Sequence, residues 1–254
     1  MVKRLLDIVL ASIGVVVLMP VLLPAMALIW LQDLRSPFYV ATRIGRGGRP
    51  FRMVKLRTMA VEADAAGIDS TAANDPRITA VGRFVRVCKL DELSQLWNVV
   101  RGDMSLVGPR PNVVGEIARY TEIEHGLLAA RPGITDFSSI VFADEGEILR
   151  GSTDADLDYN LLIRPWKSRL ALFNIERRSD VLDIALMVIT VVGIVSRRAA
   201  LGALSLILRH LDAPAELRRV ARREETLIPT APPGADHPVV AADLRELGRG
   251  GAIA

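Results

Sequence analysis

One stretch of the chain combines a helical pattern, paired acids and a rigid turn. Residues 90–111 read LDELSQLWNVVRGDMSLVGPRP. Apolar residues recur at helical spacing over residues 90–101, and Gly102 is typical of a helix end. Gly108-Pro109-Arg110-Pro111 must form an irregular turn, because proline is excluded from a helix interior. The stretch therefore predicts a helix that is followed by a rigid turn.

The predicted helix begins with two adjacent acids, Asp91 and Glu92. Acids are favoured in a first helical turn, where the helix dipole keeps them ionised, so most such pairs have no further role. An ionised aspartate is also suited to attack phosphorus or to bind Mg²⁺. Arg86 precedes the pair and Arg110 follows it, and guanidinium groups bind phosphate well. The combination suggests chemistry on a phosphorylated substrate.

The composition indicates a folded chain with a surplus of apolar residues. The 254 residues are 50% hydrophobic and 24% charged, and the mean hydropathy is +0.30. This apolar content excludes intrinsic disorder of the whole, and the single cysteine, Cys88, excludes a disulfide scaffold. The sequence contains no paired His or Cys at zinc-ligand spacing, no Walker loop and no Gly-x-Ser-x-Gly elbow.

The longest apolar run is uncharged from residue 8 to residue 31, which is long enough to cross a bilayer. Pro20 and Pro24 lie within it, and each should break or kink a helix. Two topologies remain open on this basis: a kinked spanning anchor, and a re-entrant hairpin of two short helices that enters and leaves by one face. Shorter apolar runs at 184–196 and 199–208 suit helices on a membrane surface or on a core.

A basic segment follows the apolar run. Residues 38–43 and 51–56 are predicted as strands joined by a Gly-rich turn. From residue 34 to residue 61 the segment has no acid, and its cations are Arg35, Arg43, Arg46, Arg49, Arg52, Lys55 and Arg57. Such a segment suits anionic lipid, phosphate, or both. A nucleic-acid partner is not expected, since no recognition-helix pattern accompanies the charge.

Residues 90–111 resemble the motif of the bacterial sugar transferases, which are monotopic polyprenyl-phosphate phosphoglycosyl transferases. The resemblance extends over roughly residues 1–200, because further matching motifs occur in order. They are KRLLD at 3–7, KLRTM at 55–59, DPRIT at 75–79 and RPGIT at 131–135.

The resemblance implies a reaction and roles for individual residues. A phosphosugar would pass from a nucleotide diphosphate sugar, usually a UDP-sugar, to undecaprenyl phosphate, with release of UMP. Asp91 would be the nucleophile that forms a phosphosugar-enzyme intermediate and would bind Mg²⁺, while Glu92 would handle a proton or shape the Mg²⁺ site. The residues expected to bind phosphate are Lys55, Arg57, Arg86, Arg110 and Arg131.

The resemblance also implies a re-entrant helix broken at Pro20. Met19 stands where family members carry serine, so a hydroxyl that could satisfy a freed backbone group is missing. Residues 136–140 read DFSSI where many members carry Gly-Trp-Ala-Gln. This departure suggests a different sugar preference or a different wall of the site.

We therefore predict an α+β fold that is mainly α-helical, with a proline-broken membrane helix, interfacial helices and a small β-hairpin. Residues 1–35 would form the membrane segment, 36–211 a cytoplasmic transferase domain at the bacterial inner membrane, and 212–254 a mobile tail. The alternatives are a catalytically silent membrane scaffold and a direct glycosyltransferase that releases UDP. Homo-oligomerisation remains open.

Overall fold

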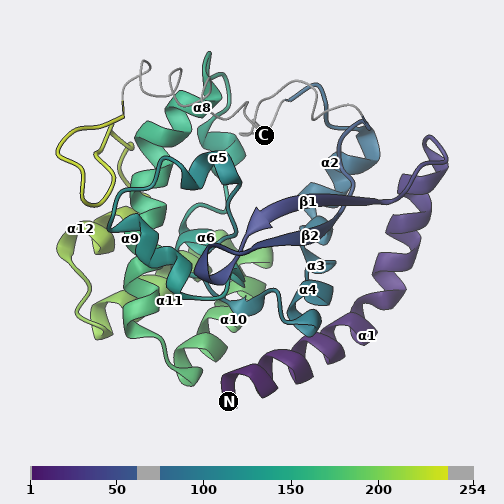
Figure 1. Cartoon of the computed structure of the whole chain (residues 1–254), viewed down its shortest axis with the longest axis horizontal. Coiled ribbons are helices and arrows are strands. Elements are labelled where there is room, and N and C mark those ends of the chain that lie inside the picture. The colour runs from purple at the N-terminus through teal and green to yellow at the C-terminus, as the bar shows by residue number, and fades with distance from the viewer. Residues whose placement is uncertain (1, 62–74, 240–254) are drawn as a thin grey trace.

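The computed structural model describes residues 2–61 and 75–239. Helices dominate this part of the chain, and the strands form two small sheets (Figure 1). The hairpin predicted from the sequence is confirmed: β1 (Phe38–Ile44) pairs antiparallel with β2 (Pro50–Leu56). A second, parallel pair joins β3 (Ser105–Val107) to β4 (Gly133–Thr135).

The remaining elements are mostly short. The α-helices after α1 (Val2–Leu31) are α2 (Ala80–Val87), α3 (Leu90–Leu93), α4 (Leu96–Arg101), α5 (Val114–Ile117), α6 (Phe137–Val141), α7 (Glu145–Ile148), α8 (Ala155–Asp158), α9 (Arg164–Arg177), α10 (Asp180–Val195), α11 (Arg197–His210) and α12 (Ala215–Arg222). The other helical segments are η1 (Arg46–Gly48), η3 (Glu124–Ala129) and the π-helical turn η4 (Tyr159–Ile163).

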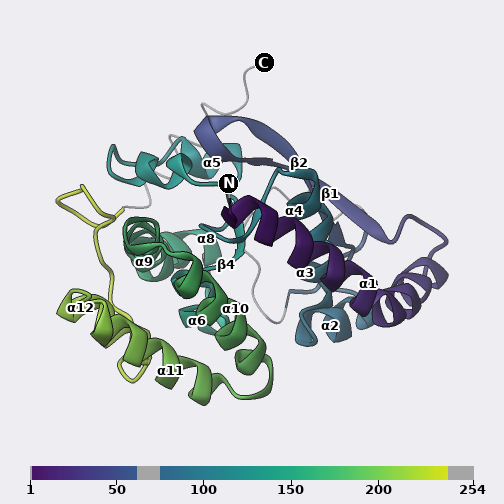
Figure 2. The same ribbon diagram turned by 90° about the horizontal axis from the view of Figure 1, so that it is seen from below.

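The elements form two groups that lie side by side in both views (Figures 1 and 2). One group holds α1 to α4 and the β1–β2 hairpin, and the other holds α5 to α12. The largest apolar cluster lies in the second group and includes Phe137, Leu170, Leu186 and Leu204. Two smaller clusters join α1 to β2, α2, α3 and α4.

Helix α1 is continuous from Val2 to Leu31, with Pro20 and Pro24 inside it. The prolines do not divide it into two helices, but it bends along its length in both views (Figures 1 and 2). A proline removes one N–H donor and pushes on the preceding turn, which is enough to kink a helix without ending it. Within the described residues, α1 is the only helix long and apolar enough to cross a membrane, so it is a candidate membrane helix.

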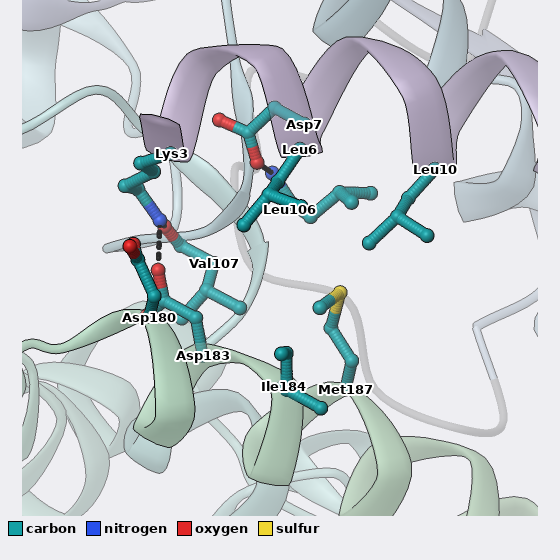
Figure 3. A pocket seen from close by; sticks show the side chains of 10 residues that line it. All are labelled: Lys3, Leu6, Asp7, Leu10, Leu106, Val107, Asp180, Asp183, Ile184 and Met187. Carbon is teal, nitrogen blue, oxygen red and sulfur yellow. Dashed lines mark hydrogen bonds and ion pairs between the residues drawn. The ribbon is translucent and has the colours of Figure 1, made fainter. Parts of the chain in front are cut away.

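The first turns of α1 are fixed to both groups by charged side chains of the KRLLD motif. Asp7 is 5% exposed and accepts hydrogen bonds from Ser105 Oγ (2.8 Å) and Leu106 N (3.0 Å). Lys3 forms an ion pair with Asp183 on α10 (Figure 3). Between these helices lies a small pocket, lined mainly by Leu6 and Leu10 from α1 and by Ile184 and Met187 from α10 (Figure 3).

The two apolar runs after residue 183 form helices, as predicted, but they differ in environment. Helix α11 packs into the main cluster through Ala200, Leu204 and Leu208. Helix α10 buries Leu186 on one side, while its other side exposes a row of valines and isoleucines. Helix α11 is therefore a core helix, and α10 has the exposed apolar surface expected of an interfacial helix.

The structure differs from the prediction of a mobile tail that begins at residue 212. Helix α12 lies in this region, and its Leu217 and Ala221 are buried in the main cluster. Farther along, Thr121 Oγ1 donates a hydrogen bond to Pro233 O at 2.5 Å. The apolar residues of α12 recur at helical spacing among arginines, which is the pattern of an amphipathic helix. The prediction of a tail relied on the overall content of Ala, Arg and Pro and missed this pattern.

A second difference concerns residues 119–130, for which the pattern favours a helix. Only Glu124–Ala129 is helical there, and it has 3-10 geometry. Glu124 is fully buried, pairs with Arg164 and accepts a hydrogen bond from Ser168 Oγ (2.6 Å). These tertiary contacts explain why the segment departs from a regular α-helix.

Candidate active site

Strand β2 brings Lys55 to the acidic pair because side chains of the 90–111 stretch bind the edge of the strand. Asn98 Oδ1 accepts from Val54 N (2.9 Å), and Asn98 Nδ2 donates to Arg52 O (2.7 Å). Ser94 Oγ donates to Val54 O at 3.3 Å. These bonds set β2 against α3 and α4, with Lys55 beside the carboxylates of α3.

The surroundings of Lys55 lower its pKa to about 8. Burial is the main cause, and the charge of Arg110 adds to it. Glu92 and Asp91 act in the opposite direction, because a nearby anion favours the ammonium form. Lys55 therefore loses its positive charge as the pH rises above about 8.

Arg86 is directed toward the same point by the packing of α2. Gly82 on this helix lies so close to Thr58 that a Cβ would approach Thr58 O to 1.9 Å. Arg86 Nε donates to Thr58 Oγ1 at 2.9 Å. Lys89, with a φ of 56°, then turns the chain sharply from α2 into α3. The turn brings Arg86 within electrostatic range of Asp91.

Arg110 comes from the Gly-Pro-Arg-Pro turn, which the second sheet fixes. Gly133 N donates to Pro109 O (2.8 Å), and Gly108 N donates to Thr135 O (2.9 Å). The two glycines approach so closely that a Cβ on Gly133 would lie 2.1 Å from Gly108 N. The turn therefore presents Arg110 from a rigid support, and Arg110 Nη2 lies 2.8 Å from Glu92 Oε1.

The two adjacent acids have different electrostatic environments. Burial alone would raise the pKa of Glu92, but the charges of Arg110 and Lys55 outweigh it and lower that pKa to about 2. For Asp91, burial and the charge of Glu92 raise the pKa, and Lys55, Arg86 and Arg110 oppose them only in part. The helix dipole was expected to dominate at Asp91, but α3 has a single turn and burial outweighs it.

The structure pairs one of the five predicted phosphate-binding residues, Arg57, with a residue outside the acidic pair, while Arg131 lies with its backbone against Gly108 of the turn. Arg57 is buried and forms an ion pair with Asp33 just after α1, where its Nη2 donates to Asp33 Oδ1 at 2.7 Å. This bond lowers the pKa of Asp33 to about 2, and Arg57 thus holds the end of α1. Arg131 is exposed, and within the described residues no ion pair joins it to either acid.

Sequence reasoning missed residues that support the site. Asn98 and Thr58 are outside the set of predicted site residues, although both lie within the matched motifs. Glu145 on α7 and Lys167 on α9 form an ion pair, and the charge of Glu145 acts on Arg110. No motif marks these two residues, and only the fold brings them near residues 90–110.

Among the residues of the site, Asp91 is the one that could bind Mg²⁺. Among the described residues, no group of three or more His, Cys, Asp or Glu is arranged as a ready-made metal cage. Mg²⁺ is commonly held by one or two carboxylates together with substrate phosphates and water. Asp91 fits such a role, because its half-buried carboxylate has no ion pair in the described parts of the chain.

The comparison with known families decides the assignment. The family model described as "Bacterial sugar transferase" matches residues 1–197. The chain belongs to the bacterial sugar transferase family. This family assignment confirms the resemblance found in residues 90–111 and in the other four motifs.

Relatives of this sugar transferase have been named for their reactions. The UDP-glucose:undecaprenyl-phosphate glucose-1-phosphate transferase of Caulobacter vibrioides is 39% identical over 171 residues, which cover 65% of this chain and 63% of that protein. The undecaprenyl-phosphate galactose phosphotransferase of Salmonella typhimurium is 36% identical over 182 residues, which cover 65% and 36%. The exopolysaccharide production protein ExoY of Rhizobium meliloti is 39% identical over 150 residues, which cover 53% and 66%. The chain thus matches from about one third to two thirds of the length of each relative.

Proposed function

We propose that this chain transfers a sugar 1-phosphate from a UDP-sugar to undecaprenyl phosphate and releases UMP. The reaction would run at the cytoplasmic face of the bacterial inner membrane, as the first step in assembling an exopolysaccharide, capsule or lipopolysaccharide glycan. The names of the relatives support the reaction class. The observation that carries the proposal is a half-buried aspartate, Asp91, within the electrostatic reach of three cations, Lys55, Arg86 and Arg110.

The transfer takes two displacements at one phosphorus. First, a carboxylate oxygen of Asp91 attacks the phosphorus that bears the sugar. The bond from that phosphorus to the bridging oxygen breaks, and UMP departs with the electron pair. Next, a phosphate oxygen of the lipid attacks the same phosphorus, and Asp91 leaves as a free carboxylate. The product is the polyprenyl diphosphate sugar, and the protein returns unchanged.

Asp91 is better suited than Glu92 to act as the nucleophile. Glu92 is bound to Arg110 at 2.8 Å and would have to break this ion pair before it attacked. Asp91 has no ion pair among the described residues, and burial raises its pKa, so its ionised carboxylate is the more basic of the two. Glu92 would instead hold Arg110 in place, with the guanidinium close to the phosphates.

The cations around Asp91 would reduce the main barrier to the reaction, which is electrostatic repulsion between the carboxylate and the diphosphate. An anion that attacks a diphosphate is repelled unless the charge of the phosphates is neutralised. Lys55 comes from β2, Arg86 from α2 and Arg110 from the turn after β3, and the charge of each acts on Asp91. Mg²⁺ bound by Asp91 and the donor phosphates would supply further neutralisation of the developing charge.

Helix α1 fits a membrane role for the same chain. It exposes large apolar side chains over most of its length, including Val16, Val17 and Leu23. At its ends, Asp7 binds Ser105 and Asp33 binds Arg57, so both ends are fixed to the transferase domain. A re-entrant helix, which enters and leaves by one face, is compatible with attachment at both ends.

The decisive assay places the purified full chain in nanodiscs with undecaprenyl phosphate, Mg²⁺ and UDP-sugars. UMP should be released, and Asp91→Asn should lower the rate by at least a thousandfold, on the order of the effect expected for removal of a nucleophile. Asp212→Asn is the matched control, since Asp212 is exposed in a loop at a φ of 51°, which asparagine tolerates. Release of UDP in place of UMP would indicate a direct glycosyltransferase. An intact UDP-sugar pool would indicate a silent scaffold.

A further inference from the structure

Next to Arg110 lies a second polar cluster that the proposed chemistry leaves unused. It consists of Glu116 on α5, Glu145 on α7, Tyr159 on η4 and Lys167 on α9. Lys167 forms an ion pair with Glu145, and its Nζ lies 5.3 Å from the centre of the Tyr159 ring. Tyr159 OH donates to Glu116 Oε1 at 3.0 Å. The four side chains therefore form one connected wall, which we call the α5–α9 wall.

The α5–α9 wall borders the candidate active site on the side of Arg110. Lys89, two residues before Asp91, donates from Nζ to Ala143 O, two residues before Glu145, at 3.2 Å. The charges of Glu92, Glu145 and Asp91 all raise the pKa of Arg110. At the other end, Arg86 interacts with Asp91 and Asp75. The wall thus adjoins Arg110, and Arg86 lies near Asp91.

The wall is open to solvent, unlike the buried ion pair beside it. Arg164 and Glu124 have side chains only 3% and 0% exposed, and Ser168 and Asn160 bond to them. The side chains of Glu145 and Lys167 are 31% and 13% exposed. The buried network around Arg164 and Glu124 stabilises the protein interior, because it is closed to solvent. An ion pair left partly open beside a reaction site is positioned to meet a ligand.

The chemistry of the α5–α9 wall suits a neutral polyhydroxyl ring. Glu116 and Glu145 are acceptors, Lys167 is a donor, and Tyr159 offers a phenol and an aromatic face. The wall holds two carboxylates and one ammonium group, so its net charge is negative and repels the phosphates of the donor and of the lipid, whereas Arg86 and Lys55 attract them. The phosphates are therefore expected at the Arg86 side, and the sugar at the wall.

Behind the wall lies the segment 136–140, whose Asp136 and Ser138 are buried. Asp136 begins that segment and caps α6, where Ser139 N donates to it at 2.7 Å. Helix α6 packs against α9, which carries Lys167, and the charge of Lys167 acts on Asp136. Helix α6 therefore packs directly against the helix that carries Lys167.

We propose that Glu116, Glu145, Tyr159 and Lys167 bind the hydroxyl groups of the hexose in the donor and determine which sugar is transferred. The inference rests on the proposed function, because it assigns the sugar subsite of that same reaction. Glu145 and Lys167 contact the ring nearest to Arg110, and Tyr159 and Glu116 contact its far edge.

The test compares Glu145→Gln and Tyr159→Phe with Glu147→Gln. Glu147 is the matched control, because it lies on the same short helix and pairs with Arg150 in full solvent, with side chains 57% and 56% exposed. Initial rates of UMP release are measured with UDP-glucose, UDP-galactose, UDP-N-acetylglucosamine and UDP-N-acetylgalactosamine. Inhibition by UMP, which lacks the sugar, is measured for each variant.

For each of the two wall variants, kcat/KM for the preferred donor should fall about tenfold or more, the loss expected when a hydrogen bond to a charged or buried group is removed. The ratio of kcat/KM between donors should change, while the UMP inhibition constant and the Glu147→Gln variant stay within about twofold of wild type. Equal losses for all donors, or a parallel change in UMP inhibition, would overturn the assignment of the wall. If wild-type protein releases no UMP from any donor, the proposed function itself fails, which is a distinct result.

Discussion

Substituting Gly133 by alanine should destabilise the turn that carries Arg110. The new Cβ would lie 2.1 Å from Gly108 N, 2.5 Å from Gly108 O and 2.6 Å from Gly108 Cα. All three are backbone atoms, so no side-chain rotation relieves the clash. Comfortable contacts between such atoms need about 3.5 Å, and therefore β3 and β4 must separate by about 1 Å.

The size of the effect follows from the contacts that this separation disturbs. The hydrogen bonds from Gly133 N to Pro109 O and from Gly108 N to Thr135 O would be strained or lost, at about 1 kcal/mol each. Overpacking adds about 1–3 kcal/mol, which gives about 3–5 kcal/mol in the free energy of unfolding. For a domain of this size the melting temperature should fall by about 6–20 °C.

Thermal unfolding of the detergent-solubilised chain measures this change, with UMP release as a second readout. Gly202→Ala is the control, since nothing lies within 4 Å of the position where its Cβ would be built in α11. That control should be stabilised by about 0.5–1 kcal/mol, the usual gain from replacing glycine in a helix. The reasoning would be refuted if Gly133→Ala melted within about 2 °C of wild type, which corresponds to a loss of about 1 kcal/mol or less, and released UMP at the wild-type rate.

Three further changes test how the site is held. Because the pKa of Lys55 is lowered to about 8, its charge disappears as pH rises through that value, and kcat/KM should fall above pH 8 in wild type but not in Lys55→Arg. An alkaline limb shared by both proteins would contradict the role of Lys55. Asn98→Asp keeps the acceptor for Val54 N but places a carboxylate near Asp103, so denaturant titration should show a loss of about 2–4 kcal/mol. An unchanged midpoint would show that Asn98 does not hold β2. Asp7→Asn leaves Leu106 N or Ser105 Oγ with a poorer acceptor and should cost about 1–3 kcal/mol by the same titration. A midpoint equal to that of wild type would show that other contacts hold α1.

Local sequence patterns predicted the parts of the fold that local contacts determine. The β1–β2 hairpin follows from two short apolar strands around a glycine-rich turn, and helices α10 and α11 follow from apolar runs bounded by charges. The sequence also predicted that Arg110 and the acids of α3 belong to one site, because residues 90–111 contain them all, but it did not predict the ion pair between Arg110 and Glu92.

Long-range partners were beyond prediction from local patterns. Arg57 belongs to a basic segment, yet Asp33 binds it, and only the path of α1 past β2 brings the two together. The α5–α9 wall joins four segments separated by up to 51 positions, from Glu116 to Lys167, and no spacing rule links them. Local patterns thus predicted which charged residues lie near Asp91 better than they predicted the residues that orient them.

The central claim is that Asp91 carries the phosphosugar, and its most direct test is to trap that intermediate. Wild-type chain is mixed with Mg²⁺ and its preferred UDP-sugar in the absence of lipid acceptor, quenched in acid, digested and analysed by mass spectrometry. The account predicts one equivalent of UMP and a sugar-phosphate adduct on the peptide containing Asp91, lost on addition of undecaprenyl phosphate and absent in Asp91→Asn. Steady formation of product without an adduct, or an adduct on another residue, would contradict it.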